Sequence, residues 1–219
     1  MKNKKKKFRE NETRENIIQP GKVLYDEIKG NWHDKYFFNK GPITLELACG
    51  WGQYTLGLAK KFPQQNFIGV DIKGDRLWKG STLALEDGLG NAAFLRTRIE
   101  LLDNFFVDNE VDNMWLMFPD PRPRKRDAKR RITSPRFLDL YKQLLRPGGL
   151  LMLKTDNEML FEYSLEVLKE RSDIEDLVYT RDLYSSELEG ECHDIRTKYE
   201  EIFTAEGHNI HYLRFTFKA

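Results

Sequence analysis

Two acids and two glycines in the first half of the chain have the types and spacing to hold a small ligand. Glu46 lies within the apolar run "ITLELACG", four residues before Gly50, and Gly52 follows two residues later. Glycines allow the backbone to turn tightly and to approach a ligand closely. Because a helix is expected from residue 53, an acid beside its N-terminus would repel a phosphate. Glu46 therefore favours a cationic ligand.

A second acid, Asp71, follows in the next apolar run, "NFIGVDI", 21 residues after Gly50. Nucleotide sites in α/β proteins place an acid here to accept hydrogen bonds from ribose hydroxyls. A dinucleotide fingerprint would need a third glycine where Thr55 stands, which weakens the pyrophosphate interpretation. Both acids together indicate a positively charged adenosyl ligand, such as S-adenosylmethionine. The alternatives are a surface position for Glu46 and a helix-capping role for Asp71.

The stretch "FPDPRPRKRDAKRR", residues 118–131, places one carboxylate beside a dense positive charge. Asp120 lies between two prolines, which stiffen the turn. Seven of the ten residues from Arg122 to Arg131 are Lys or Arg. Such a run can bind nucleic-acid phosphates, and each contact would make the affinity depend on salt. The alternative is a solvated loop, which is the usual state of a charge run.

These residues need a scaffold that brings the ends of several strands together. Short β-prone runs alternate with segments of helical spacing, which predicts a mostly parallel sheet with helices on both faces. We expect strands at 43–50, 66–72, 92–99, 111–118 and 150–156, and helices at 53–62, 74–88, 157–170 and from 134 to the "RPGG" stop. Ligands of such sheets bind beyond the carboxyl ends of the strands. Residues 209–219 predict a late antiparallel edge strand, paired with a segment near 173–179.

Composition sets the outer limits of this interpretation. The 219 residues suit one domain, and a hydrophobic content of 40% can form a core. Since the net charge is only +1, a basic surface must come from uneven placement. We expect residues 1–16 to be a basic disordered arm and 17–219 to be a single domain. The two cysteines form no disulfide framework, which predicts a cytoplasmic protein. The histidine spacing predicts no metal site. The lack of a long apolar run predicts no membrane contact.

Four segments together resemble the bacterial tRNA (guanine-N7-)-methyltransferases: "LELACGWG", "FPDPRPRKRDAKRR", "RPGGLLMLKTDN" and "RTKYEEIFTAEGHNIHYLRF". The resemblance extends from about residue 43 to the C-terminus. It implies an α/β, Rossmann-like class I methyltransferase fold with a mostly parallel seven-stranded sheet. It also implies S-adenosylmethionine as cofactor and tRNA as substrate, with methylation at N7 of guanine 46 in the variable loop, by a monomer or a homodimer.

The resemblance also implies roles for individual residues. Asp120 would be the catalytic aspartate. The cofactor-binding residues would be Glu46, Gly50, Gly52, Asp71, Glu100 and Asp120. The substrate-binding residues would be Arg124, Asp156, Thr197, Lys198 and Glu200. The chain departs from the family at Arg122, Arg124 and Asp127, and Arg98 stands where the family often has an acid that contacts the adenine end. Glu100, two residues later, is the nearest substitute for that acid.

The chemistry of guanine N7 limits what the protein must supply. N7 carries a lone pair and no proton, so methyl transfer needs no general base and depends on positioning and electrostatics. Asp120 would stabilise positive charge on the purine, and Asp156 or Glu200 would accept hydrogen bonds from guanine N1 and N2. Other classes stay open: a methyltransferase for another RNA or another guanine, a dinucleotide-dependent oxidoreductase, and an inactive RNA-binding module.

Overall fold

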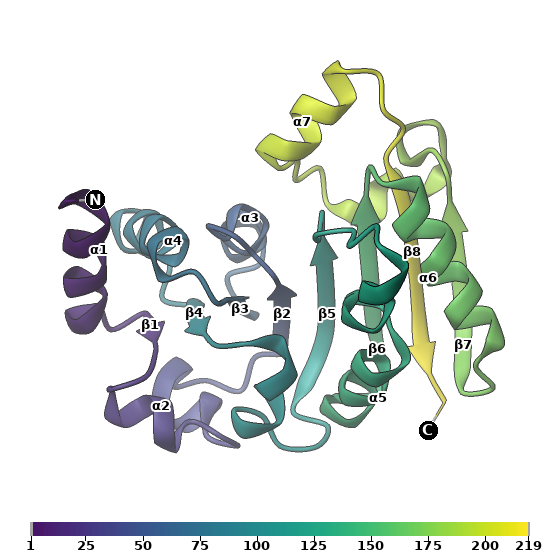
Figure 1. The fold of residues 1–219 in the computed structure, drawn as a ribbon. Coiled ribbons are helices and arrows are strands. Elements are labelled where there is room, and N and C mark those ends of the chain that lie inside the picture. The colour runs from purple at the N-terminus through teal and green to yellow at the C-terminus, as the bar shows by residue number, and fades with distance from the viewer. Residues whose placement is uncertain (1, 219) are drawn as a thin grey trace.

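The computed structural model describes residues 2–218, and its centre is one mixed sheet. The strand order is β1-β4-β3-β2-β5-β6-β8-β7. The strands from β1 to β6 are parallel, whereas β8 is antiparallel to both of its neighbours. Figure 1 shows the parallel arrowheads pointing to the end of the molecule where α7 lies.

The strands are β1 Ile17–Ile18, β2 Ile43–Leu47, β3 Asn66–Asp71, β4 Ala92–Arg96, β5 Val111–Met117, β6 Leu145–Thr155, β7 Ile174–Thr180 and β8 His211–Phe217. The α-helices are α1 Lys2–Thr13, α2 Val23–Glu27, α3 Gln53–Lys61, α4 Gly74–Glu86, α5 Pro135–Leu144, α6 Glu158–Glu170 and α7 Lys198–Ala205. The shorter π- and 3₁₀-helical turns are η1 Trp32–Phe37, η2 Ile99–Asn104, η3 Lys125–Arg130, η4 Leu183–Ser185 and η5 Glu187–Cys192.

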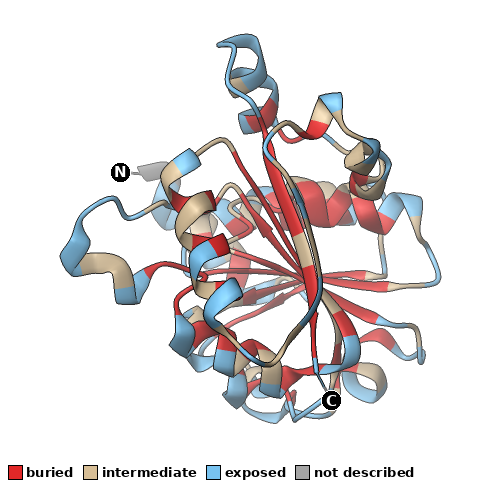
Figure 2. Cartoon of the chain, turned by 90° about the vertical axis from the view of Figure 1, so that its right-hand side faces the viewer, coloured by how far each residue is buried: buried red, intermediate tan, exposed pale blue. Residues whose placement is uncertain are grey.

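Successive side chains of a strand point to opposite faces of the sheet, so the core consists of two apolar clusters, one on each face. Ile43, Leu45 and Leu47 of β2 belong to the cluster beneath α5 and α6. Phe67 of β3 and Trp115 of β5 belong to the opposite cluster, with apolar residues of α3, α4 and η5. Figure 2 shows the central strands almost entirely buried between helices whose outer sides are exposed. The prediction of a parallel sheet covered on both faces is confirmed.

Two details of the sheet differ from the expectation. The described chain has eight strands in place of seven, because Ile17–Ile18 forms a short parallel strand beside β4. The C-terminal strand is antiparallel, as predicted, but it lies one position in from the edge. The segment Ile174–Thr180 pairs with it and forms the edge itself. An edge position suits β7, whose residues are all exposed or half-buried, better than the mostly buried β8.

The N-terminal segment also differs from the expected disordered arm, although Met1 lies outside the described residues. Lys2–Thr13 forms α1, which lies beside α4 (Figure 1). Asn11 is buried and donates from Nδ2 to the carbonyl of Gly74 at 2.7 Å. Arg14 donates to the carbonyl of Trp78 at 2.8 Å, and its guanidinium lies over the indole ring. The lysine-rich composition predicts disorder, but these specific polar contacts to α4 dock the segment instead.

Candidate active site

The site lies at the carboxyl ends of β2 and β5, where the strand order reverses direction. Ligands of open α/β sheets bind in the crevice at this point. The crevice contains a first cleft of about 430 Å³, lined by residues that include Glu46, Gly50, Asp120, Asp156 and Thr197. A second cleft of about 390 Å³ adjoins it and is lined by Asp71, Thr97, Arg98 and Glu100, among others. Ala48, Arg76, Phe118, Pro119 and Asp120 line both clefts.

The glycine turn after β2 forms the floor of the first cleft. Ala48, Gly50 and Gly52 all have positive φ, at 58°, 61° and 74°. A Cβ atom added to Gly52 would lie 2.5 Å from Cε1 of Phe94, so no larger side chain fits there. The predicted importance of Gly52 therefore has a steric reason in the close approach of this turn to β4.

Glu46 is buried, which excludes the surface position left open by the sequence. Its Oε2 accepts hydrogen bonds from the Thr55 amide at 2.7 Å and from the Thr55 hydroxyl at 2.5 Å. Burial raises the pKa of the Glu46 carboxyl to about 7, although the two bonds from Thr55 oppose the shift. The side chain thus fixes the first turn of α3 and also faces the first cleft.

Asp71 holds the glycine turn against the start of α4. Its Oδ2 accepts from the Gly50 amide at 2.9 Å, and its Oδ1 accepts from the Lys73 amide at 2.8 Å. Lys73 is itself the N-cap residue of α4, and no side chain among residues 2–218 caps this helix, so Asp71 does not have the capping role that the sequence left open. Since Asp71 also lines the second cleft, one carboxylate connects the two parts of the crevice.

Asp120 lies on the wall that the two clefts share. Its side chain is 68% exposed, and Arg122 contacts it through the backbone amide at 3.2 Å and through Nε at 3.3 Å. The flanking residues Phe118 and Arg122 have positive φ values of 45° and 50°. Such strain in residues other than glycine occurs often at functional sites. The backbone therefore presents this carboxylate to the crevice at some conformational cost.

Asp156 and Thr197 complete the first cleft from the other side. Asp156 follows β6, and the next residue, Asn157, caps α6 by accepting from the Leu160 amide at 2.9 Å. Thr197 precedes α7 and forms a capping box with Glu200. The structure thus brings Glu46, Asp120, Asp156 and Thr197 into one cleft from four separate segments of the chain.

The remaining predicted substrate residues do not line that cleft. Glu200 is fully buried and forms an ion pair with Lys154, and it also accepts a hydrogen bond from the Tyr184 hydroxyl. Both of its oxygens have partners inside the protein, because Oε2 also accepts from the Thr197 amide at 3.2 Å. Lys198 is exposed at the start of α7, and Arg124 is exposed beside η3.

Glu100, the predicted contact for the adenine end of a cofactor, lines the second cleft. Its carboxylate is shared by Arg98 at 3.7 Å and Arg136 at 3.3 Å. The two guanidinium groups reduce the negative charge that Glu100 can offer to a ligand.

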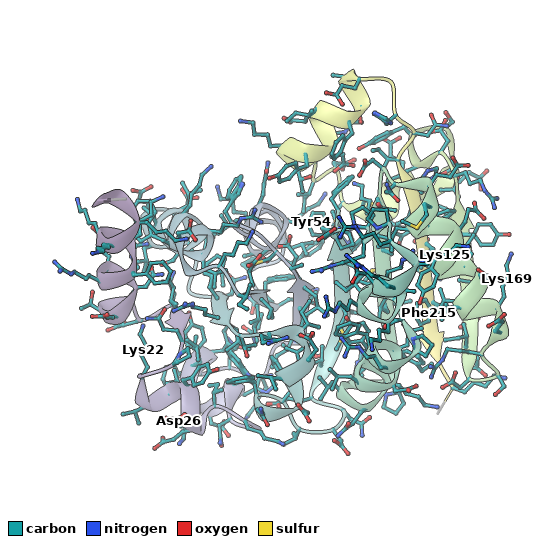
Figure 3. The ribbon with its side chains drawn as sticks, in the orientation of Figure 1. Lys22, Asp26, Tyr54, Lys125, Lys169 and Phe215 are labelled. Carbon is teal, nitrogen blue, oxygen red and sulfur yellow. The ribbon has the colours of Figure 1, made fainter. Side chains whose placement is uncertain are left out.

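The basic run is not uniform in its exposure. Arg124, Lys125 and Arg126 are exposed, whereas Arg131 is 7% exposed and lies over the Tyr163 ring at 4.4 Å. Arg131 also donates to the carbonyl of Arg122 at 3.2 Å. Figure 3 shows Lys125 in the half of the molecule that carries Tyr54 and α7, far from Lys22 and Asp26. The exposed part of the run is therefore the candidate phosphate contact, and Arg131 supports the loop.

Sequence reasoning missed several residues around the site. Lys154 is buried within β6, and Tyr184 comes from a loop that carries no motif. Gln53 and Arg76 also line the first cleft. A lysine inside the apolar run "LLMLKTD" was a usable signal, because a buried lysine must have a partner.

Residues 2–218 contain neither a metal-binding cluster nor a helix that could span a membrane. No group of three or more His, Cys, Asp or Glu side chains is arranged to hold a metal ion in this part of the chain. No helix among the same residues is long and apolar enough to cross a membrane.

Comparison with known proteins places the chain among methyltransferases. Residues 40–213 match the sequence family described as "Putative methyltransferase". The tRNA (guanine-N(7)-)-methyltransferase of Cytophaga hutchinsonii is 48% identical over 212 residues, covering 96% of each chain. The crystal structure of the 16S rRNA methyltransferase KamB aligns with a TM-score of 0.61 at 14% identity, over 91% of this chain and 94% of that one. A Haemonchus contortus phosphoethanolamine N-methyltransferase 2 in complex with S-adenosyl-L-methionine aligns with a TM-score of 0.54 at 13% identity, over 93% and 54%.

Proposed function

The chain belongs to the tRNA (guanine-N(7)-)-methyltransferase family, and we propose that it methylates N7 of guanine 46 in the variable loop of tRNA. It is an enzyme of the Rossmann-like methyltransferase class. We propose S-adenosylmethionine as its methyl donor. The observation that carries the proposal is the meeting of Glu46, Asp120, Asp156 and Thr197 in one cleft at the reversal point of the sheet.

The crevice fits the chemistry of this cofactor. Carboxylates in both clefts suit a ligand with a sulfonium and an amino group, since opposite charges attract strongly in a partly buried site. Glu46 would hold the amino-acid end in the first cleft. Asp71 and the exposed face of Ile72 would hold the ribose and the adenine in the second cleft. When bound, the cofactor supplies an electrophilic methyl group on sulfur.

The protein's own part in the reaction is positioning and charge. Guanine N7 attacks without losing a proton, so no side chain has to act as a base. The purine becomes positively charged during transfer, and the exposed carboxylate of Asp120 on the shared wall is placed to stabilise that charge. Pro119 and Pro121 on either side limit its movement.

We propose that guanine is selected by the wall of the first cleft that lies opposite Asp120. Asp156 would accept hydrogen bonds from guanine N1 and N2, which adenine cannot offer in the same pattern. Thr197 and the exposed aromatic ring of Tyr199 lie on the same side, at the start of α7. Glu200 would act indirectly, because its buried pair with Lys154 fixes α7 over the cleft.

The exposed basic residues Arg124, Lys125 and Arg126 would bind tRNA phosphates near the target base. Arg124 replaces the lysine that is usual in the family. Its planar guanidinium would bind a phosphate through two parallel hydrogen bonds, whereas a lysine ammonium acts as a point charge. This contact would position the backbone while the cleft receives the base.

The test is labelled methyl transfer from S-adenosylmethionine to a tRNA transcript, followed by reduction and aniline cleavage to locate 7-methylguanosine. We expect cleavage at nucleotide 46 and no incorporation into a transcript with adenine there. Incorporation into both transcripts would contradict the proposed position. Methylation of other RNA with no methylation of tRNA would favour the alternative substrate class.

A further inference from the structure

The segment from Cys192 to Lys198 lies along one side of α3, and the proposed mechanism does not explain why. The Lys61 ammonium, at the C-terminal end of α3, donates to the carbonyl of His193 at 2.7 Å. The Tyr54 hydroxyl donates to the carbonyl of Cys192 at 3.2 Å. The helix that begins at the glycine turn therefore also holds the segment that leads into α7.

The middle of α3 is shaped for the same segment. Gly57 lies inside the helix, where glycine is less favourable than alanine. A Cβ atom at this position would lie 2.7 Å from Cγ2 of Ile195, with two further Ile195 atoms within 3.3 Å. The glycine opens a notch that receives the Ile195 side chain. This close approach is a physical reason for a residue that weakens the helix.

The first residue of α3 makes the most specific contact. Gln53 donates from Nε2 to the carbonyl of Arg196 at 3.2 Å, and its Oε1 accepts from the amide of Lys198 at 2.8 Å. The amide side chain therefore pairs with the backbone on both sides of Thr197. Gln53 follows directly after Gly52, so it connects the floor of the first cleft with the start of α7.

We propose that Gln53 is a positioning residue that sets the guanine-binding segment, Arg196–Lys198, in register with the cofactor-binding turn. The inference rests on the proposed function, because it assigns the base to the cleft beside Thr197. Methyl transfer requires the acceptor nitrogen and the donor to be aligned within a fraction of an ångström. The contacts at Tyr54, Gly57 and Lys61 hold the segment along α3, and Gln53 fixes its last residues where the base would bind.

Replacement of Gln53 separates this role from simple cofactor binding. Gln53→Ala should raise the KM for tRNA about tenfold and leave the Kd for S-adenosylmethionine within about twofold, measured by steady-state kinetics and calorimetry. Amide hydrogen exchange in residues 192–200 should become faster. Gln53→Glu keeps the acceptor for the Lys198 amide and should recover part of the KM. Gln53→Met keeps the volume without either bond and should behave like Gln53→Ala. If Gln53→Met matches the wild-type protein, the proposal is wrong.

A second pair of variants tests the notch. Gly57→Ala should increase exchange in residues 192–200 and raise the KM for tRNA, and adding Ile195→Ala should restore both, because the clash disappears. Gln64→Ala, an exposed glutamine beyond the end of α3, is the matched control and should change neither. Unchanged exchange in both Gln53→Ala and Gly57→Ala would overturn the proposal. Hydrogen exchange does not depend on catalysis, so a wild-type protein that fails to methylate tRNA would remove the proposed function without deciding this test.

Discussion

At the scale of single residues, Glu46 shows how one side chain serves structure and ligand together. Its Oε2 holds the first turn of α3 through Thr55, while the carboxylate faces the cleft. A fully solvated acid would be ionised at every physiological pH. Burial instead raises the pKa of Glu46 to about 7, so its charge varies in the neutral range.

Cofactor affinity should therefore depend on pH through Glu46. An acid with a pKa of about 7 gains a proton as the pH falls through that value, and the attraction for a cation is then lost. We expect the Kd for S-adenosylmethionine to rise towards about tenfold per pH unit below 7. Glu46→Gln keeps an acceptor for Thr55, and it should bind weakly at pH 8 with a much flatter pH profile. Calorimetry from pH 5.5 to 8.5 measures both proteins, and parallel profiles would exclude Glu46 as the titrating group.

Asp120 should affect the chemical step more than cofactor binding. Its carboxylate is exposed on the shared wall, and removing its charge leaves the strained turn in place. Asp120→Asn should lower kcat by about 10²–10³-fold, the usual range for losing one electrostatic stabiliser. Asp127→Asn in the same loop is the control, because that acid pairs with Arg130 and lines neither cleft. Equal losses in the two variants, by single-turnover kinetics, would argue against a catalytic role for Asp120.

At the scale of elements, α7 depends on a buried ion pair for its place over the cleft. Lys154 of β6 and Glu200 of α7 are both almost fully buried, and the Tyr184 hydroxyl adds a hydrogen bond to the same carboxylate. Thr197 and Glu200 also form the capping box that starts the helix. The ion pair connects α7 to β6, and Figure 1 shows this helix at the end of the molecule to which the β6 arrow points.

Breaking this pair from one side should be costly. Lys154→Met leaves the Glu200 carboxylate buried without its cation, and we expect a loss of about 3–5 kcal/mol in unfolding free energy. The double variant Lys154→Met with Glu200→Leu removes both charges and should recover much of that loss. Urea denaturation gives the unfolding free energies of the wild-type protein, the two single variants and the double variant. If the double variant is less stable by the sum of the two single changes, the pair does not act as a unit.

At the scale of the whole molecule, charge placement matters more than total charge. The net charge is only +1, but η3 and the residues before it place several exposed cations at the same end as the cleft. Arg131 of the same run is buried against Tyr163 and is not available to a ligand. The electrostatic surface for RNA is therefore smaller than the sequence run suggests.

Replacing Arg124, Lys125 and Arg126 by Ala should weaken tRNA binding and flatten its salt dependence. Each lost phosphate contact should reduce the slope of log K against log salt by about 0.7–0.9. The control replaces Lys29, Lys35 and Lys40, three exposed lysines that precede β2 at the amino ends of the strands. Filter binding over roughly 50 to 300 mM salt would give the slope for the wild-type protein, the triple variant and the control. Equal slopes in the triple variant and the wild-type protein would contradict the phosphate role.

Much of the fold and part of the site follow from local sequence signals. The alternation of strands and helices predicts the sheet, because apolar period and turn residues are local properties. Gly52 is needed after β2 because a larger side chain would clash with Phe94, and Asp71 at the end of β3 accepts a hydrogen bond from the Gly50 amide. The motif that contains Glu200 does not say which way its side chain points, and the structure places that carboxylate in a buried ion pair with Lys154. The helix at Lys2–Thr13 could not be read from its lysine-rich composition, because its docking depends on partners about 60 residues away.

The sequence by itself determined the class of protein and the kinds of groups that carry the chemistry. It identified the carboxylates at strand ends and the cations after Asp120, because both signals are contained in short stretches of chain. Only the tertiary structure decided which of these groups line the same cleft and which form buried ion pairs. It also decided how α3 holds the segment from Cys192 to Lys198. These outcomes depend on packing between distant segments, where one side chain's burial is set by neighbours that the local sequence does not contain.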